Sequence, residues 1–365
     1  MSRKLKIAII GSRGYPYVYS GYETLVKELS ERLVESGNEV VVYCHRKLFT
    51  NKPKKVNGIN LVYTPSLKSK FLSQFYNSFF SIIHACFSNS DIILVVNVAN
   101  GPFGLLTKLF KKKTIINVDG VEWKRPKWKG LGSIYFKFAA FLATKFYDKI
   151  ITDSDEMFNI YLNEFKSKST VIAYGHNKSF ENETDVLKKY FLNKNEFFLV
   201  IGRLIPDNNA DFILKQFIAS NTKRKLVIVG DVPYHDIYSK KLKSIENERI
   251  TFTGYINCEN ELADLYKNCY AYVHGHEFGG TNPTMINAIF YNSKIYALQN
   301  KFSKEMLDNV ENKFFFTKKD NSLKKLFEKQ IKKSNKFNRI KEKYDWDKIS
   351  EKYIKLFKNL MESEV

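Results

Sequence analysis

The opening of the chain alternates a strand, a glycine-containing loop, a helix and a second strand, and this order constrains its fold more than any other feature. An apolar run over residues 6–10 ends at Gly11, and residues 23–36 carry leucines at helical spacing. A second strand is predicted over residues 39–44 directly afterwards. A strand, a crossover helix and a strand in this order imply a parallel sheet.

The same cycle restarts in the second half of the chain, with a strand predicted over residues 197–202 and a helix near residues 210–220. Further buried strands are predicted over residues 59–63, 92–97, 114–118, 149–152, 170–173, 226–230, 250–253 and 271–273. The fold class is therefore predicted to be α/β, with two Rossmann-like, doubly wound parallel-sheet lobes. Open parallel sheets bind ligands outside the carboxyl ends of their strands, so we expect two such lobes to face a central cleft.

Shifts in composition set the expected domain limits. The first lobe is predicted to span residues 1–180 and the second residues 181–343. The second lobe opens with a polar, charged linker over residues 181–196 that includes a short helix, and it closes with a Lys/Asn-rich stretch over 318–343. Residues 344–365 are amphipathic, and we expect them to form a helix that packs back towards the first lobe.

The composition excludes several protein classes. With 44% hydrophobic and 15% aromatic residues, the 365-residue chain can bury a large core, which excludes global disorder. The N-terminal apolar run is too short for a signal peptide, and the longest apolar stretch, residues 71–87, contains Ser, Gln, Asn and His and falls short of the ~20 apolar residues of a membrane span. The four cysteines have no paired spacing, so we expect reduced thiols in the cytoplasm and neither zinc nor disulfides.

The formal net charge of +21 is unevenly distributed. Residues 1–180 contain 27 Lys/Arg and 13 Asp/Glu, whereas the remainder contains 32 and 25. A basic first half favours an anionic partner, which could be nucleic acid, a phosphate-bearing substrate or the inner leaflet of a membrane. The alternative is a solubilising surface with no partner.

The loop over residues 11–21 contains three glycines between the first strand and the first helix. A helix that begins behind such a loop offers free backbone N–H groups to an anion, so the loop could approach a phosphate. Its G-x-x-G spacing differs from the G-x-G-x-x-G of dinucleotide-binding proteins, which argues against a nicotinamide dehydrogenase. A tight turn without a ligand is the alternative.

Two segments of the second lobe are candidates for binding a diphosphate. Arg203 stands where the first strand of this lobe ends, and its guanidinium could contact a diphosphate in a bidentate manner, although it could also pair with Asp207. In residues 274–288, a Gly-Gly turn precedes a predicted helix whose N-terminus would point at a ligand. His274 and His276 would share a face of a strand, but no third metal ligand is spaced nearby.

Two further motifs leave alternatives open. Asp153-Ser154-Asp155 resembles a metal-carrying D-x-D, yet a helix N-cap is the preferred interpretation. Residues 108–129 interleave Lys and Arg with Trp123 and Trp128, a pattern that suits nucleic acid, a membrane interface, or a solvated basic face with two packed indoles.

Several segments together resemble the retaining glycosyltransferases of family 4, which have the GT-B fold. The resemblance is greatest to the bacterial rhamnosyltransferases of cell-surface polysaccharide biosynthesis, the subgroup that builds cell-wall and capsular polysaccharide. The segments are IAIIGSRGYP with SGYET, VDGVEWKRPKW, ITDS, GRLIPDNN, HGHEFGGTNPT and YDWDKI, and they span nearly the whole chain. The combination is more specific than any one of its motifs.

The resemblance implies a role for each matching residue. Arg203 would hold the donor diphosphate, residues 277–283 would wrap the sugar and phosphates, and residues 11–21 would face the reaction centre. The implied catalytic residues are Asp119, Arg203 and Glu277. The implied donor-binding residues are Gly21, Asn208, Gly279, Gly280, Thr281, Asn282 and Asn287. The implied acceptor-side residues are Gly14, Tyr22, Glu23, Glu122 and Trp123.

Three positions differ from the pattern of the wider family. Asp119 stands where many family 4 enzymes carry a histidine that touches the 6-hydroxyl of the donor sugar, which is consistent with a 6-deoxy sugar such as rhamnose. The usual lysine after the arginine-bearing strand is replaced by Asn208-Asn209, as in the rhamnosyltransferase-like subgroup. Asn287 replaces a glutamate that grips the nucleotide ribose, and an amide lacks the charge that strengthens such a bond.

The resemblance therefore implies transfer of L-rhamnose from dTDP-rhamnose to a lipid-linked oligosaccharide, by a peripheral enzyme on the anionic cytoplasmic face of the membrane. Neither a metal nor another cofactor is expected, and nucleic acid is disfavoured as a partner. One alternative is a transferase that uses a UDP-hexose. Another, motivated by Asn287, is a catalytically lapsed GT-B protein that binds a nucleotide or a partner.

Overall fold

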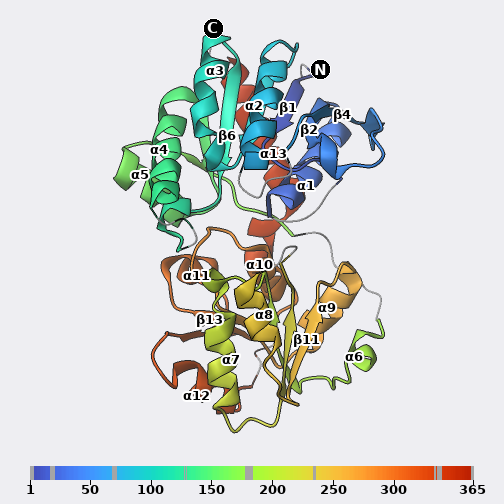
Figure 1. Ribbon diagram of the computed structural model, residues 1–365, viewed down its shortest axis with the longest axis vertical. Helices are drawn as coiled ribbons and strands as arrows, with labels where there is room; N and C mark the ends of the chain where they lie inside the picture. Colours follow the sequence, from blue (N-terminus) through green and yellow to red (C-terminus); the bar gives the residue numbers. More distant parts are fainter. Residues whose placement is uncertain are drawn as a thin grey trace. The chain divides into compact units, whose positions relative to one another are not determined.

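The computed structural model describes residues 4–16, 21–67, 72–126, 128, 130–176, 184–232, 236–332, 334 and 339–362. The chain divides into two compact units, which are drawn in Figure 1. Unit 1 comprises the residues up to Gly175 together with those from Asp345 onwards, and unit 2 comprises His176–Tyr344. The boundary thus lies close to the limit at residue 180 that was expected from composition.

Unit 1 is built on an eight-stranded sheet in the order β3-β4-β2-β1-β5-β6-β7-β8. All neighbouring strands are parallel except the short hairpin of β3 with β4. The strands are β1 (Lys6–Ile10), β2 (Glu39–His45), β3 (Lys55–Val56), β4 (Ile59–Thr64), β5 (Ile92–Val96), β6 (Lys113–Val118), β7 (Lys149–Thr152) and β8 (Thr170–Val171).

The helices of unit 1 connect these strands as crossovers. They are α1 (Gly21–Glu35), α2 (Leu72–Cys86), α3 (Gly104–Leu109), α4 (Leu131–Phe146) and α5 (Asp155–Phe165), with short 3₁₀ turns η1 (Arg46–Leu48), η2 (Val98–Phe103) and η3 (Glu122–Lys124). The leucines Leu25, Leu29 and Leu33 of α1 are fully buried, as their helical spacing predicts. The chain builds outwards from β1 on one side and from β5 on the other, so the topological switch point lies between these two strands.

The C-terminal helix α13 (Trp346–Glu362) belongs to unit 1 and packs beside α1 (Figure 1). Its buried face carries Trp346, Ile349, Tyr353 and Phe357. Asp345 caps the helix, because its Oδ1 accepts hydrogen bonds from the backbone N–H of Asp347 and Lys348 at 2.7 and 3.3 Å.

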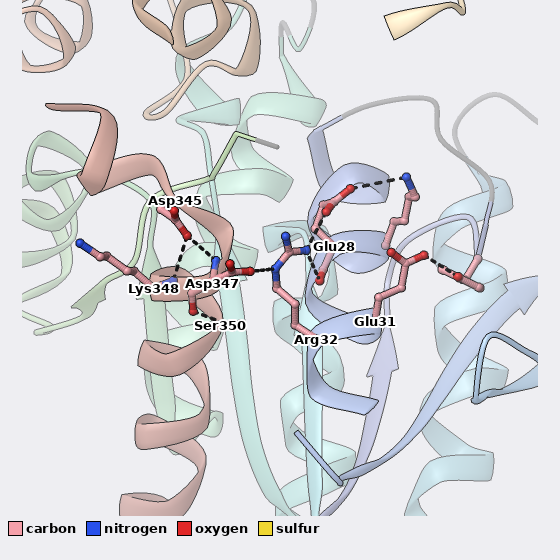
Figure 2. Close-up of polar contacts among 9 residues, drawn as sticks. Glu28, Glu31, Arg32, Asp345, Asp347, Lys348 and Ser350 are labelled. Carbon is pink, nitrogen blue, oxygen red and sulfur yellow. Dashed lines mark hydrogen bonds and ion pairs between the residues drawn. The ribbon is translucent and has the colours of Figure 1, made fainter. Parts of the chain in front are cut away.

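One ion pair joins the two helices, as Figure 2 shows: Arg32 Nε of α1 lies 2.8 Å from Asp347 Oδ1 of α13. Burial lowers the pKa of the Arg32 guanidinium, but its bonds to Asp347 and Glu28 outweigh burial and raise it. The Asp347 side chain is 57% exposed, so this pair contributes little beside the buried aromatic face.

Unit 2 is built on a fully parallel six-stranded sheet in the order β11-β10-β9-β12-β13-β14. Its strands are β9 (Phe197–Ile201), β10 (Lys225–Val229), β11 (Ile250–Gly254), β12 (Ala271–His274), β13 (Ile295–Leu298) and β14 (Lys313–Phe316). Its helices are α6 (Val186–Lys189), η4 (Pro206–Asn208), α7 (Ala210–Ile218), α8 (Ile237–Lys243), α9 (Glu259–Asn268), α10 (Pro283–Phe290), α11 (Lys301–Met306), α12 (Ser322–Glu328) and η5 (Arg339–Tyr344).

The linker of unit 2 contains the short helix that was predicted there, α6, which packs against α9. Thr184, just before α6, donates hydrogen bonds to Asp264 of α9 from its backbone N–H and its hydroxyl. Strands β13 and β14 were not predicted, because short apolar runs of four residues carry no periodicity that separates strand from helix. The Lys/Asn-rich stretch includes α12, whose Leu323 and Phe327 are buried in the same core as Phe198 and Phe217.

No helix among the described residues is long and apolar enough to cross a membrane. The four cysteines, which all lie within the described residues, are thiols and not disulfides; Cys44, Cys86 and Cys269 are buried and Cys258 is exposed. Burial raises the pKa of the Cys44 thiol to about 12, so this group is an inert part of the core.

Candidate functional site

The switch point of unit 2 lies between β9 and β12, where the strand order reverses direction. Gly202 follows β9, and Gly275 follows β12. Added Cβ atoms would lie 3.0 Å from His276 Cε1 at Gly202 and 2.4 Å from the Asn208 carbonyl oxygen at Gly275. At Gly275 only glycine fits, because the neighbouring atom is backbone, whereas a Cβ at Gly202 would need the His276 ring to shift. This close packing brings the two strand ends and the 3₁₀ turn η4 together at one edge of the sheet.

Arg203 is exposed at the tip of β9, and its backbone is held by η4. The Asn208 side-chain Nδ2 and the Ile205 backbone N–H donate to the Arg203 carbonyl oxygen at 2.8 and 2.9 Å. The guanidinium therefore extends from a braced turn into solvent at the carboxyl edge. This placement suits a cation that meets an anionic ligand.

Glu277 is held from three sides. Asn209 Nδ2 donates to Glu277 Oε1 at 2.9 Å and to the Gly275 carbonyl oxygen at 2.8 Å, and the Glu277 backbone N–H donates to the Asp207 carbonyl oxygen at 3.1 Å. Lys318, which follows β14, forms an ion pair with Glu277 Oε1. The Glu277 side chain is 23% exposed, so its carboxylate is oriented and still accessible to a ligand.

The start of α10 follows the Gly-Gly turn directly. Gly279 has φ +114°, a conformation that disfavours any residue with a Cβ. Asn282 is the N-cap, with its Oδ1 accepting from the Thr284 backbone N–H at 3.0 Å, and Pro283 occupies the first turn. Gly280 and Thr281 are buried beside this cap. The predicted donor-binding segment is thus ordered as a turn that leads into a helix N-terminus.

His274 and His276 stack on each other, with ring centroids 4.4 Å apart. Both line a small pocket together with Gly279 and Asn282. Tyr272 Oη lies 2.9 Å from His274 Nδ1. Burial, with a smaller contribution from His276, lowers the pKa of His274 well below 6.5, so this imidazole is neutral.

Asn287 lies on α10, half-buried, one turn after the cap. It hydrogen-bonds the hydroxyl of Tyr266 on α9, and that hydroxyl donates its proton to the Thr284 carbonyl oxygen at 2.9 Å. The Asn287 amide must therefore be the donor to Tyr266, which a carboxylate at this position could not be. The amide has a structural partner within unit 2.

At the carboxyl edge of unit 1, the glycines of the first loop serve close packing. An added Cβ at Gly11 would lie 2.2 Å from the Val96 carbonyl oxygen, and one at Gly14 would lie 2.8 Å from Cys44. Gly21 begins α1, and the buried Glu23 on that helix accepts from the Arg13 backbone N–H at 3.0 Å. Residues 17–20 of this loop lie outside the described residues.

Asp119, which follows β6, stands in a cluster of phenols. Tyr174 Oη donates to Asp119 Oδ2 at 2.9 Å, and Tyr22 on α1 also hydrogen-bonds this carboxylate. Burial raises the pKa of Asp119 above 3.8, and the repulsion from Glu122 adds to it, although the hydrogen bonds from Tyr22 and Tyr174 lower it. Burial likewise raises the pKa of Tyr22 well above 10.0, so the phenol stays protonated and can donate to the carboxylate.

Glu122 and Trp123 have different environments. Glu122 is half-buried, with Arg125 Nε 2.8 Å from its Oε1 and Trp128 Nε1 donating to its Oε2 at 2.7 Å. The Trp123 indole is 7% exposed, packs edge-on against Phe165 and donates to Glu164. The Trp123 indole is thus buried in unit 1 and the Trp128 indole is half-buried against it, an arrangement that favours the alternative of a basic face with two packed indoles.

The D-x-D motif is a helix cap, as its preferred interpretation predicted: Ser154 Oγ accepts from the Met157 backbone N–H at 3.2 Å at the start of α5. Within the described part of the chain, no three His, Cys, Asp or Glu side chains gather as they would to hold a metal ion.

Three residues near the carboxyl edges of the two sheets could not be predicted as site residues from the local sequence. Tyr174 and Tyr353 join the Asp119 cluster of unit 1 from segments distant in sequence, the latter accepting from Asn117 Nδ2 at 2.9 Å. Lys318 joins Glu277 from the end of an unpredicted strand. The order of the strands and the packing of α13 bring them to these positions.

Two family models match the chain. Residues 182–357 match "Glycosyl transferases group 1", and residues 4–177 match a "Domain of unknown function (DUF1972)". An uncharacterized glycosyltransferase of Methanocaldococcus jannaschii is 25% identical to the chain, and the alignment covers 98% of this chain and 100% of that protein.

Solved structures share the fold over the whole length. Sucrose-phosphate synthase from Thermosynechococcus elongatus has a TM-score of 0.81 at 16% identity, with 99% of this chain and 100% of that one covered. HepE of Anabaena, in complex with UDP and glucose, has a TM-score of 0.74 at 14% identity, with 97% and 100% covered. The two parallel-sheet units are those of the GT-B fold.

Proposed function

We propose that this chain is a glycosyltransferase of the group 1 family and that it takes its sugar from a nucleotide diphosphate bound by unit 2. Residues 182–357 match the model of that family, and residues 4–177 match DUF1972. The observation that carries the proposal is the carboxyl edge of β9 and β12. An exposed arginine, an oriented carboxylate and a capped helix N-terminus follow these strands there.

The chemistry of this edge suits the departure of a diphosphate. Arg203 and the N-terminus of α10 would stabilise the negative charge that develops as the bond between the anomeric carbon and the diphosphate oxygen breaks. The acceptor hydroxyl would attack from the same face, and its proton would pass to the leaving diphosphate. The configuration is then retained without a covalent protein intermediate, as the resemblance to family 4 implies.

Glu277 would accept hydrogen bonds from the hydroxyls of the donor sugar, since Asn209 and Lys318 hold its carboxylate without covering it. Gly279, Gly280 and Thr281 would let the backbone approach the phosphates. Asn208 would act indirectly, because its amide is used to brace the Arg203 turn. Asn287 would be at most a neutral contact to the ribose, because its amide already donates to Tyr266.

L-Rhamnose from dTDP-rhamnose is the donor we propose. The support is the resemblance to bacterial rhamnosyltransferases and the presence of Asp119 where a histidine commonly touches the 6-hydroxyl. In unit 1 the Asp119 carboxylate is held by two phenols, and a sugar without a 6-hydroxyl needs no partner at that position. Tyr22 and Glu122 surround the same carboxylate and are the acceptor-side residues that remain in this proposal.

The acceptor we propose is a lipid-linked oligosaccharide, and the enzyme would work as a peripheral protein on the cytoplasmic face of the membrane. The support is the resemblance and the basic character of the first half of the chain, which suits anionic lipids.

The test is transfer from a panel of nucleotide sugars to membrane extracts, with the product measured by mass spectrometry. We expect the mass increment of a deoxyhexose, and we expect dTDP-rhamnose to be the best donor. A hexose increment from a UDP-sugar would favour the second candidate, a UDP-hexose transferase, which the HepE complexes with UDP and glucose motivate. Binding of nucleotides with no transfer from any donor would identify a lapsed enzyme.

Transfer is expected to persist when EDTA is present in excess. The reason is that the proposed site supplies positive charge from Arg203 and a helix N-terminus, and the D-x-D segment is used as a cap. The measurement is the initial rate with and without chelator, and with Mg²⁺ or Mn²⁺ added back. Loss of activity in EDTA and its recovery with either ion would contradict this account of the diphosphate site.

A further inference from the structure

Two helices of unit 1 expose apolar side chains on their outer surface. On α4, the exposed fractions are 84% for Leu131, 66% for Ile134, 54% for Phe138 and 42% for Phe141. On α3, Leu105 and Leu109 are 45% and 69% exposed. We call these six side chains the α3–α4 face. Solvated apolar side chains are ordinary when scattered, but a contiguous group of them marks an interaction surface.

The exposed residues of α4 form one straight stripe. At roughly 100° per residue, Leu131, Ile134, Phe138 and Phe141 fall within an arc of about 80°. The buried residues of the same helix, among them Phe136 and Ala140, lie on the opposite side and pack into unit 1. The helix is therefore apolar on two faces, and only one of them is covered by the described part of this chain.

Helices α3 and α4 pack against each other (Figure 1). Lys108 of α3 reaches across, with its Nζ 3.3 Å from the Lys145 carbonyl oxygen and 5.9 Å from the centroid of the Phe146 ring. This contact places the basic end of α3 beside the C-terminal end of the α4 stripe. Lys145 Nζ in turn lies 5.4 Å from the centroid of the Phe141 ring.

The charge on and next to the two helices of this face is predominantly positive. Lys108, Lys111, Lys137 and Lys145 are exposed on or next to the two helices. Over residues 99–146 the sequence contains ten Lys or Arg and only two acidic residues, Asp119 and Glu122. Both acids are half-buried, Asp119 within the phenol cluster and Glu122 against Arg125, so neither offsets the exposed lysines.

We infer that the α3–α4 face docks unit 1 on an anionic lipid bilayer, with its Leu, Ile and Phe side chains in the acyl boundary and its lysines at the phosphates. An apolar stripe with lysines at its margin is the composition of a helix that lies in the membrane interface. The lysine stems extend along the apolar surface while their ammonium groups meet the headgroups. The inference rests on the proposed membrane-linked acceptor and names the surface that would bring unit 1 to it.

A second copy of the chain is a poorer occupant of this face. A two-fold symmetric dimer would place the face against itself, and the lysines of both copies would then meet without acidic partners. An anionic membrane complements both the apolar stripe and the charge. The face also differs from the tryptophan-containing segment, where Trp123 is buried and the half-buried Trp128 donates to Glu122.

The test is co-sedimentation of the full chain with vesicles of phosphatidylcholine alone, or of phosphatidylcholine with phosphatidylglycerol as the minor component. We expect binding to the anionic vesicles, weakened by salt. The double variant Ile134→Ser/Phe138→Ser should weaken it by at least roughly tenfold, and Lys137→Gln/Lys145→Gln should weaken it and reduce its salt dependence. The matched control is Ile237→Ser on α8 of unit 2, where an isoleucine is 81% exposed outside the face.

Insertion itself is measured by placing a fluorophore in the stripe. On binding to vesicles, the fluorescence spectrum of Phe138→Trp minus that of the wild type should shift to the blue, and lipids with brominated acyl chains should quench it. The corresponding difference for Ile237→Trp should show neither effect. Equal binding by the wild type and Ile134→Ser/Phe138→Ser, or no quenching of Phe138→Trp on bound protein, would overturn the inference. So would concentration-dependent dimerisation that the same double variant abolishes, because it would assign the face to a second copy.

The test of membrane docking and the test of the proposed function can fail independently of each other. The stripe variants should keep the wild-type affinity for the nucleotide in solution, and Arg203→Ala should keep the wild-type binding to anionic vesicles. Loss of vesicle binding with an intact nucleotide affinity concerns only the α3–α4 face. A chain that binds anionic vesicles but transfers no sugar contradicts only the proposed function.

Discussion

Replacement of Arg203 by alanine is expected to lower kcat/KM for sugar transfer by more than roughly tenfold and to leave the fold intact. The side chain removed is an exposed guanidinium at the tip of β9, while its backbone is braced by Asn208 and Ile205, which the substitution does not touch. A charge-assisted hydrogen bond contributes about 1.5–3 kcal/mol, and each 1.36 kcal/mol of lost transition-state stabilisation lowers the rate about tenfold.

The measurement is kcat and KM with saturating acceptor, together with a thermal melt of each variant. A fall in kcat with little change in KM would place the contact in the transition state, where the charge on the leaving diphosphate develops. Arg203→Lys should recover part of the activity, because it restores the charge but not the planar fork. The matched control is Lys223→Ala, an exposed lysine before β10 at the opposite edge of the same sheet. Unchanged turnover in a folded Arg203→Ala protein would remove Arg203 from the proposed site.

Replacement of Trp346 by alanine is expected to destabilise unit 1 by about 3–5 kcal/mol, the range for removing a large aromatic side chain from a core. Trp346 is 2% exposed and opens α13, and its ring occupies the space next to Gly175, where an added Cβ would lie 2.5 Å from the indole. Because the surroundings of a truncated core side chain relax only partially, we expect a residual cavity at this position.

The measurement is urea unfolding followed by far-UV circular dichroism, since the fluorescence of the removed indole cannot be compared. The control is Lys355→Ala on the exposed side of the same helix, which should change the free energy of unfolding by less than about 0.5 kcal/mol. Equal midpoints for Trp346→Ala and Lys355→Ala would show that α13 adds little to unit 1.

Much of the local structure could be predicted from sequence. The leucine stripe of α1 and the strands around β1 and β9 follow from periodicity, because burial on one face of a helix or on both faces of a parallel strand leaves a regular pattern. The position of Arg203 follows from the same reasoning, since it stands at the end of a predicted strand. The cap at Ser154 was preferred over a metal site because the helix begins directly after it.

Other features could not be predicted because their causes are distant in sequence. The local sequence around Trp123 and Trp128 does not distinguish indoles that face lipid from indoles that pack against the protein. Their contacts with Glu164, Phe165 and Phe136 become visible only in the structure. The exposed stripe of α4 is as apolar as a core helix, so its exposure depends on which elements unit 1 places beside it.

The sequence by itself therefore determined the elements, the two parallel sheets and the strand ends that carry Arg203, Glu277 and Asp119, because hydrophobic period and glycine placement act over a few residues. Only the tertiary structure decided that Lys318 pairs with Glu277, that Tyr174 and Tyr22 hold Asp119, and that Tyr353 of α13 accepts a hydrogen bond from Asn117. Such contacts depend on strand order and helix packing. These are selected by the burial of whole faces against each other, and no short segment encodes that choice.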